Sequence, residues 1–183
     1  MQVNLIPCDI PGPVIIEPQV HEDPRGFFLE SWSADAFREA GFDADFVQDN
    51  HSRSQRGVLR GLHFQNPMAQ GKLVRVVNGA VFDVVVDLRW SSSSFGRWIG
   101  LELSDQNRRM LWIPAGFAHG FLTLEDDTDF LYKCTAPYAP EHEHTLAWND
   151  PAMGIEWPMD RSDIVISEKD ARGLSLAEVP AFA

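Results

Sequence analysis

The chain has 183 residues, 44% of them hydrophobic, and a formal net charge of −12 at pH 7. This length and composition indicate one domain, residues 1–183, with a sizeable apolar core, and they exclude a disordered chain. The acidic balance argues against nucleic acid as a partner, because phosphate binding requires a basic face.

The N-terminal stretch MQVNLIPCDIPGP has neither a basic start nor a long apolar stretch, so it does not have the features of a secretory signal. No apolar run reaches the roughly 18 residues of a membrane-spanning helix, and we expect no membrane partner. Cys8 and Cys134 lie far apart in the sequence and have no metal-ligand spacing. We therefore expect a cytoplasmic chain with two buried thiols.

Glycine and proline divide the chain into short segments that are rich in Val, Ile, Phe and Trp. In chain order, we expect strands over residues 13–20, 25–32, 57–65, 72–78, 80–88, 97–103, 109–114, 119–124 and 128–135. Short, closely spaced strands favour an antiparallel sandwich or barrel over a βαβ fold. Between two of them, Asn78-Gly79 suits the positive-φ positions of a type I′ turn and predicts a β-hairpin.

Two short helices are expected beside the strands. Residues 32–42 have Ser33 as a candidate N-cap and Gly41 as a stop, and residues 167–174 open with Ser167.

Positive charge is concentrated in one part of this acidic chain. Residues 50–82 contain no acidic residue, and they carry Arg53, Arg56, Arg60, Lys72 and Arg75. Such a segment can concentrate an anionic small ligand, although a solvated basic edge would have the same composition.

Side chains alternate between the two faces of a strand. In residues 72–78, Lys72 shares a face with two valines, and in residues 128–135, Tyr132 shares a face with Phe130 and Cys134. If that second face is interior, Tyr132 points into the barrel.

Strict alternation in residues 57–65 would put Arg60 and His63 on opposite faces. Glycine weakens a strand interior, and a buried arginine needs a partner. We predict that Gly61 marks a bulge or twist that brings both side chains into one cavity; a regular ladder with Arg60 on the outer surface would contradict this.

The histidines do not form a recognisable metal site. Small metal-binding barrels typically place two histidines two positions apart on a strand, but here Gln65 follows His63 at that spacing. His142 and His144 have the spacing but lie in the polar stretch EHEHT, which reads as a loop. A metal needs several ligands in fixed geometry, so we expect no metal.

Motifs for nucleophilic, redox and phosphoryl-transfer chemistry are absent from the sequence, which leaves proton transfer. His63 is a candidate base, Tyr132 a candidate acid and Lys72 a candidate anion partner. Each has a plain structural alternative: a core histidine, an ordinary barrel tyrosine, or a lysine that reaches solvent. Asp170 could act as a helix cap in Ser167-x-x-Asp170, and His119 could lie in a loop.

Several motifs together resemble the dTDP-4-dehydrorhamnose 3,5-epimerase family, whose members act on a nucleotide-linked 4-keto-6-deoxy sugar. They run through nearly the whole chain in the family's order: DPRGFFLE (23–30), FVQDNHS (46–52), VLRGLHFQ (58–65), QGKLVRVVNGAVFDVVVDLR (70–89), FGRWIGLELS (95–104), WIPAGFAHGF (112–121), FLYKCT (130–135), WNDPAMGIEWP (148–158) and SEKDA (167–171).

The resemblance implies a cupin-type antiparallel jelly roll with a few short helices, no metal and no cofactor, and a homodimer that exchanges N-terminal strands. It implies that His63, paired with Asp170, is the base, that Tyr132 is the acid, and that Lys72 stabilises the enolate. It implies a thymine-stacking role for Tyr138. The other positions that match substrate-binding residues are Arg25, Glu30, Gln48, Asn50, Arg60, His119, Glu143 and Lys169.

Carbons 3 and 5 of such a sugar both flank the carbonyl at carbon 4, so one base can serve both by enolisation. The resemblance therefore predicts inversion at both carbons, in dTDP-rhamnose biosynthesis. Three alternatives stay open: a mono-epimerase of carbon 3 or 5, a ketoisomerase of another deoxysugar pathway, and a sugar-binding module without catalysis.

Overall fold

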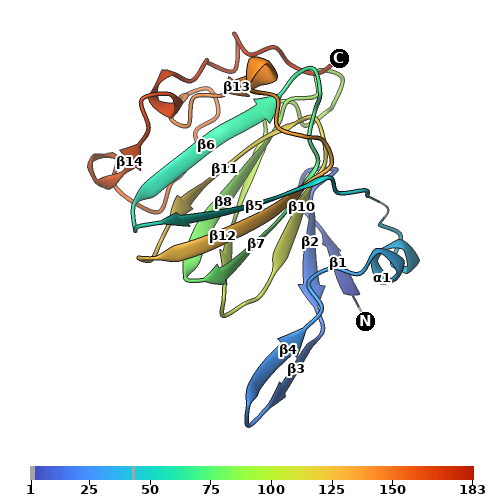
Figure 1. Ribbon diagram of the computed structural model, residues 1–183. Helices are drawn as coiled ribbons and strands as arrows, with labels where there is room; N and C mark the ends of the chain where they lie inside the picture. Colours follow the sequence, from blue (N-terminus) through green and yellow to red (C-terminus); the bar gives the residue numbers. More distant parts are fainter. Residues whose placement is uncertain (1–2, 43) are drawn as a thin grey trace.

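The computed structural model describes residues 3–42 and 44–183, and two facing β-sheets dominate it (Figure 1). In spatial order, the first sheet contains β1 (Val3–Pro7), β2 (Val14–Pro18), β10 (Met110–Ile113), β7 (Lys72–Asn78), β12 (Thr128–Cys134) and β5 (Gln48–Ser54). The second contains β13 (Glu143–Thr145), β6 (Val58–Gln65), β11 (Phe117–Thr123), β8 (Ala80–Asp87) and β9 (Trp98–Ser104), and β14 (Val165–Ile166) pairs with β6.

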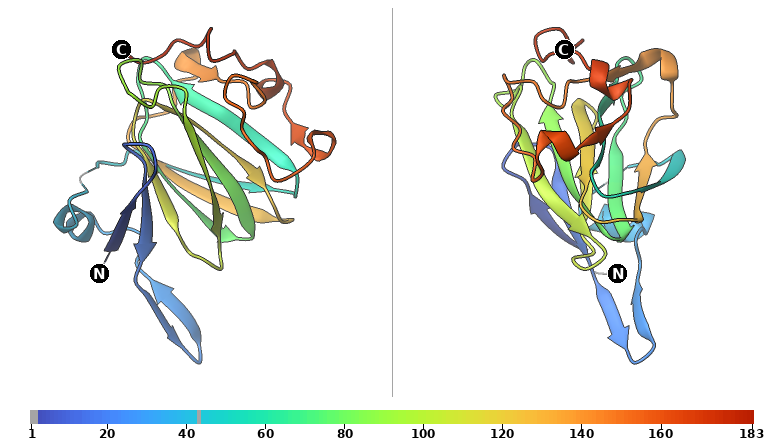
Figure 2. Two further views of the ribbon diagram at one scale, coloured as in Figure 1. Left: turned by 180° about the vertical axis from the view of Figure 1, so that it is seen from behind. Right: turned by 90° about the vertical axis from the view of Figure 1, so that its left-hand side faces the viewer.

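All pairings in the two sheets are antiparallel except that of β14 with β6, within the described residues. This arrangement confirms the expected antiparallel jelly roll. A separate hairpin of β3 (Val20–Asp23) and β4 (Gly26–Leu29) projects from the body of the molecule (Figure 2). None of the described helices is both long and apolar enough to cross a membrane.

Apolar side chains fill the space between the sheets and also cover the outer face of the second sheet. Val74 and Phe130 from the first sheet meet Val81 and Phe121 from the second in the interior. On the outer face of the second sheet, the C-terminal segment 174–182 packs against the strands. This segment shields apolar strand residues from water.

The helix predictions are confirmed in one case and wrong in the other. Helix α1 (Ala34–Glu39) begins after Ser33, whose hydroxyl accepts a hydrogen bond from the Ala36 N–H. The predicted helix over 167–174 is only a 3₁₀ turn, Asp170–Arg172. Two further 3₁₀ turns span Pro140–His142 and Arg161–Asp163.

The prediction of a hairpin at Asn78-Gly79 is wrong. Strand β7 pairs with β10 and β12, whereas β8 pairs with β9 and β11, so this turn carries the chain from one sheet to the other. Gly79 has a positive φ of 78°, and a Cβ there would lie 2.4 Å from the Thr128 hydroxyl. The close approach of Thr128 therefore requires a glycine at position 79. The Asn78-Gly79 dipeptide favours a tight turn, but it does not specify which strands pair.

The predicted bulge at Gly61 is confirmed. Phe121 pairs with Arg60 and His119 pairs with His63. Between these two pairs, β6 advances by three residues and β11 by only two, so β6 contains one extra residue. Gly61 has a φ of 119°, and a Cβ there would lie 2.6 Å from the Cα of Gly120. The extra residue shifts the alternation, and Arg60 and His63 line the same cavity.

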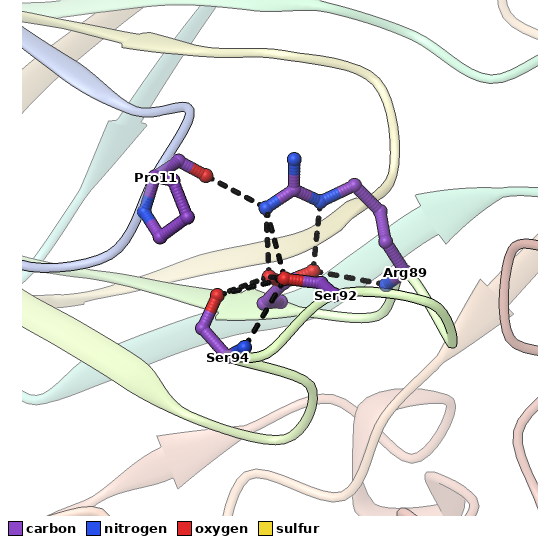
Figure 3. A network of polar contacts seen from close by, with 5 residues as sticks. Pro11, Arg89, Ser92 and Ser94 are labelled. Carbon is purple, nitrogen blue, oxygen red and sulfur yellow. Dashed lines mark hydrogen bonds and ion pairs between the residues drawn. The ribbon is translucent and has the colours of Figure 1, made fainter.

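A buried aspartate fixes the loop after β8 (Figure 3). The Asp87 carboxylate accepts hydrogen bonds from the backbone and side chain of Arg89 and from the hydroxyls of Ser92 and Ser94, at 2.6–2.9 Å. Arg89 also donates to the Pro11 carbonyl at 2.6 Å, which ties this loop to the turn between β1 and β2. Burial raises the pKa of Asp87, but these hydrogen bonds outweigh it and lower the pKa to about 2.

The two cysteines differ in exposure. Cys134 is buried, as expected, but Cys8 is only partly buried, and both thiols are free. A cytoplasmic location stays a prediction.

Candidate active site

A cavity of about 670 Å³ lies between the two sheets, a size common for small-molecule sites. Of the candidate residues named from the sequence, the cavity is lined by Gln48, Asn50, Arg60, His63, Lys72, His119, Tyr132, Tyr138, Glu143, Lys169 and Asp170. Only Arg25 and Glu30 do not line it. Strands of both sheets therefore bring together residues that are more than one hundred positions apart in the chain.

His63 and Asp170 form a close pair on the wall of the second sheet. His63 Nε2 lies 2.6 Å from Asp170 Oδ1, and the same carboxylate accepts a hydrogen bond from the Gly61 N–H at 3.3 Å. Burial raises the pKa of Asp170, but the hydrogen bond and the electrostatic interaction with His63 outweigh it and lower the pKa. The ionised carboxylate holds the proton on Nε2 and leaves Nδ1 as the basic nitrogen.

The capping interpretation of Asp170 is partly correct. The Ser167 hydroxyl accepts a hydrogen bond from the Asp170 backbone N–H at 3.1 Å, as in a helix cap. The Asp170 carboxylate, however, contacts His63. One residue thus serves both the turn and the histidine.

Tyr132 lies on the opposite wall. It is on β12 in the first sheet, and His63 is on β6 in the second. Tyr132 lines the cavity together with Phe130 and Cys134, as the alternation along β12 predicted for an interior face. Burial raises the pKa of the Tyr132 phenol, so its proton stays bound at neutral pH. A proton acceptor and a proton donor therefore face the cavity from two different sheets.

Lys72 supplies positive charge to the cavity from β7. Burial lowers the pKa of its ammonium, while the negative charges of Glu143 and Asp83, among other groups, act in the opposite direction. An ammonium that burial desolvates in this way is stabilised by any anion that binds or develops beside it.

A second histidine–aspartate pair lies next to the first. His119 is the cross-strand partner of His63, and its Nε2 lies 2.9 Å from the carboxylate of the fully buried Asp83. His119 is thus a strand residue, not a loop residue. Burial raises the pKa of Asp83, and the charge of His119 opposes this effect.

Tyr138 and four other candidate binding residues are linked by hydrogen bonds and an ion pair. The Tyr138 hydroxyl donates to Glu143 at 2.8 Å, and Lys169 forms an ion pair with the same carboxylate. Glu143 Oε1 lies 4.0 Å from His63 Nδ1. Gln48 accepts a hydrogen bond from the Tyr138 N–H at 2.8 Å and donates to Asn50 at 3.0 Å.

The basic segment is divided between the cavity and the outer surface. Arg60 and Lys72 line the cavity, and Arg60 Nε donates to the Ser54 hydroxyl at 3.0 Å. Arg53, by contrast, pairs with Asp129 through two hydrogen bonds of 2.9 and 2.7 Å. Two of the five basic residues of this segment therefore line the cavity, where they can attract an anionic ligand.

Arg25 and Glu30 lie on the projecting hairpin, away from this chain's cavity. Arg25 is in the turn between β3 and β4, where it pairs with Asp23, and Glu30 directly follows β4. The adjacent Phe27 and Phe28 have 58% and 65% of their surface exposed.

The structure uses the residues considered for metal binding in other ways. Gln65 donates to the carbonyls of Met68 and Pro137 and accepts from the Ala139 N–H. His144 lies on β13, so the expectation of a loop is wrong there. In residues 3–42 and 44–183, no group of three or more His, Cys, Asp or Glu side chains is arranged to hold a metal ion.

Several residues of the site were missed from the sequence. Asp83, which bonds His119 but does not itself line the cavity, could have been found, because a carboxylate inside the apolar run AVFDVVVD requires a buried partner. Gln65 and Cys134 were noted but given no role in the cavity. Strand β5, which contributes Ser52, was missed because QDNHSRS has no apolar alternation.

Comparison with known proteins gives a consistent result. The family model described as dTDP-4-dehydrorhamnose 3,5-epimerase matches residues 7–178. A dTDP-4-dehydrorhamnose 3,5-epimerase of Pseudomonas aeruginosa is 55% identical over 174 residues, which cover 94% of this chain and 96% of that protein.

Solved structures agree in fold. The dTDP-6-deoxy-D-glucose-3,5-epimerase of Legionella pneumophila, in complex with dTDP-4-keto-L-rhamnose, has a TM-score of 0.93 and 49% identity, and the match covers 97% of this chain and 95% of that one. A 3'-monoepimerase of Streptomyces bikiniensis, in complex with dTDP-quinovose, is less similar, with a TM-score of 0.88, 38% identity, and coverage of 94% and 87%.

Proposed function

This chain belongs to the dTDP-4-dehydrorhamnose 3,5-epimerase family, and we propose that it inverts carbons 3 and 5 of dTDP-4-dehydro-6-deoxy-D-glucose to give dTDP-4-dehydro-L-rhamnose. The reaction is a step of dTDP-rhamnose biosynthesis. The observation that supports the mechanism best is the His63–Asp170 pair on one wall of the cavity with Tyr132 on the other.

His63 Nδ1 removes the proton from a carbon next to the C4 ketone. Asp170 holds the imidazole by Nε2 and stabilises the imidazolium that forms. The C–H electron pair moves into the C3–C4 or C4–C5 bond, and the carbonyl oxygen becomes an enolate oxygen.

Lys72 stabilises the negative charge of this enolate. Burial desolvates its ammonium, so attraction to an oxyanion is stronger than in water. His119, held by Asp83, lies at a substrate-contacting position on the same side as His63.

Tyr132 then donates its phenolic proton to the same carbon from the other face, which inverts the configuration. The raised pKa of Tyr132 keeps this proton available, and the tyrosinate takes a proton from solvent afterwards, as His63 releases one. Each inversion thus replaces a carbon-bound hydrogen with a solvent-derived one.

The nucleotide part of the substrate is bound at the mouth of the cavity. The Arg60 guanidinium suits the diphosphate, and Tyr138, which is 52% exposed, stacks on the thymine. Gln48, Asn50, Glu143 and Lys169 surround Tyr138 as further binding residues.

A homodimer with exchanged N-terminal strands accounts for Arg25 and Glu30. These residues match substrate-binding positions but do not line their own cavity. The hairpin that carries them projects from the body of the molecule (Figure 2). In the dimer, the hairpin brings them to the partner's cavity, and its exposed phenylalanines become buried. Size-exclusion chromatography with light scattering tests the dimer.

Proton NMR of the reaction in heavy water tests the function. Deuterium at both carbon 3 and carbon 5 supports the proposal. Deuterium at one carbon indicates a mono-epimerase, the activity of the Streptomyces bikiniensis protein. If the substrate binds but deuterium enters neither carbon, both the 3,5-epimerase and the mono-epimerase activities are contradicted.

A further inference from the structure

Three glutamine side chains that line the cavity bind the backbone of one short segment, residues 136–139. Gln70 donates to the Ala136 carbonyl at 2.8 Å, and Gln65 donates to the Pro137 carbonyl at 3.3 Å. Gln48 accepts from the Tyr138 N–H at 2.8 Å, and Gln65 also accepts from the Ala139 N–H at 3.0 Å. Every residue of the segment is thus bound by a glutamine amide.

These glutamines come from different parts of the fold. Gln48 begins β5 in the first sheet, Gln65 ends β6 in the second, and Gln70 lies in the connection before β7. The segment that they bind is not part of a strand, so its backbone groups have no ladder partners. Side-chain amides therefore replace the sheet hydrogen bonds that would otherwise fix it.

The side chain that this segment presents is unusual for a tightly fixed loop. Tyr138 is 52% exposed, although its backbone is held by Gln48 and its hydroxyl donates to Glu143. An aromatic ring that is both exposed and fixed at a cavity mouth is ready to stack on a flat ligand without a further loss of entropy.

We propose that Gln48, Gln65 and Gln70 form a clamp that fixes Tyr138 as a stacking platform for the base of the nucleotide, and that Gln65 and Gln70 are positioning residues for substrate binding. The identity of the base rests on the proposed function. Gln65, which is 3% exposed, holds both sides of Tyr138 and is the centre of the clamp.

A double-mutant cycle with dTDP as the probe tests the clamp. Stacking on an aromatic residue contributes roughly tenfold or more to affinity per base. By calorimetry, we expect Gln65→Met to weaken dTDP binding about tenfold, because the ring is no longer held in place. In the Tyr138→Ala background, the same change should cost less than about twofold, because no platform remains to be positioned.

Kinetics give a second readout. Gln65→Met should raise KM by a factor similar to that in the dTDP dissociation constant and leave kcat within about threefold, since the clamp does not touch the reacting carbons. Gln106→Met, which removes an exposed glutamine that bonds Asp105, is the matched control and should change neither.

Two results would overturn the clamp. One is that Gln65→Met lowers dTDP affinity equally in the wild-type and the Tyr138→Ala backgrounds. The other is that Gln65→Met lowers it in neither, or that the wild-type protein does not bind dTDP. If Gln65→Met does not fold, Gln70→Met removes only the bond to Ala136 and should show the same coupling at about threefold. Failure of the proposed function would appear differently, as dTDP binding and coupling without deuterium exchange into the sugar.

Discussion

The buried Asp87 allows a quantitative prediction of stability. Its pKa of about 2, against an ordinary value of 3.8, corresponds to about 2.5 kcal/mol at roughly 1.36 kcal/mol per pKa unit. Because the folded-state pKa is lowered, this contribution is fully present above the unfolded pKa. It is lost as the pH falls through the folded value, so about 1 kcal/mol is gone by pH 3.

Asp87→Asn removes this contribution at every pH. The variant should therefore be less stable than wild type by at least about 2.5 kcal/mol at pH 7. At pH 3 this difference in stability should be smaller by about 1 kcal/mol. Urea unfolding followed by tryptophan fluorescence at the two pH values measures both differences. Asp163→Asn, at an exposed position, is the control and should stay within about 0.5 kcal/mol of wild type. A stability difference that is small at pH 7, or independent of pH, would refute the reasoning.

Three further changes test the cavity. Asp170→Ala should lower kcat at least about a hundredfold and lower the melting temperature only modestly; near-normal turnover with a large loss of stability would favour the capping role alone. Tyr132→Phe should retain deuterium exchange at the reacting carbons but slow inversion at least about a hundredfold, and normal inversion would remove the tyrosine from the acid role. Gly61→Ala should cost at least about 2 kcal/mol in urea unfolding and also lower kcat/KM, because a Cβ would lie 2.6 Å from a neighbouring backbone atom. Gly154→Ala, where φ is 62° and a Cβ has open space, should cost less, and equal costs would contradict the steric reason.

Residues on apolar strands were the easiest to place from the sequence. Tyr132 alternates with Phe130 and Cys134, and an interior apolar face requires that all three point into the cavity. The conflict at Arg60 and His63 was equally informative, because a glycine between two residues on opposite faces predicts a bulge.

Features that depend on distant pairing could not be read from local patterns. Asn78-Gly79 has the composition of a hairpin turn, but the partners of β7 are β10 and β12, which lie elsewhere in the chain. Strand β5 has no apolar alternation, and its pairing with β12 makes it a strand. The bonds from Gln65 to the segment around Tyr138 depend on the same long-range geometry.

Arg25 and Glu30 show a different limit. Their motif places them at substrate-binding positions, but no local pattern says to which chain's cavity they belong. The single chain leaves them on a projecting hairpin, so their role depends on an assembly.

The central claim is that one base, His63, serves both carbon 3 and carbon 5. Proton NMR of His63→Ala with the 4-keto sugar nucleotide in heavy water tests it most directly. We expect deuterium exchange at both carbons to be lost together, while affinity for the nucleotide sugar stays within a few fold of wild type. Retained exchange at either carbon would contradict a single base at His63.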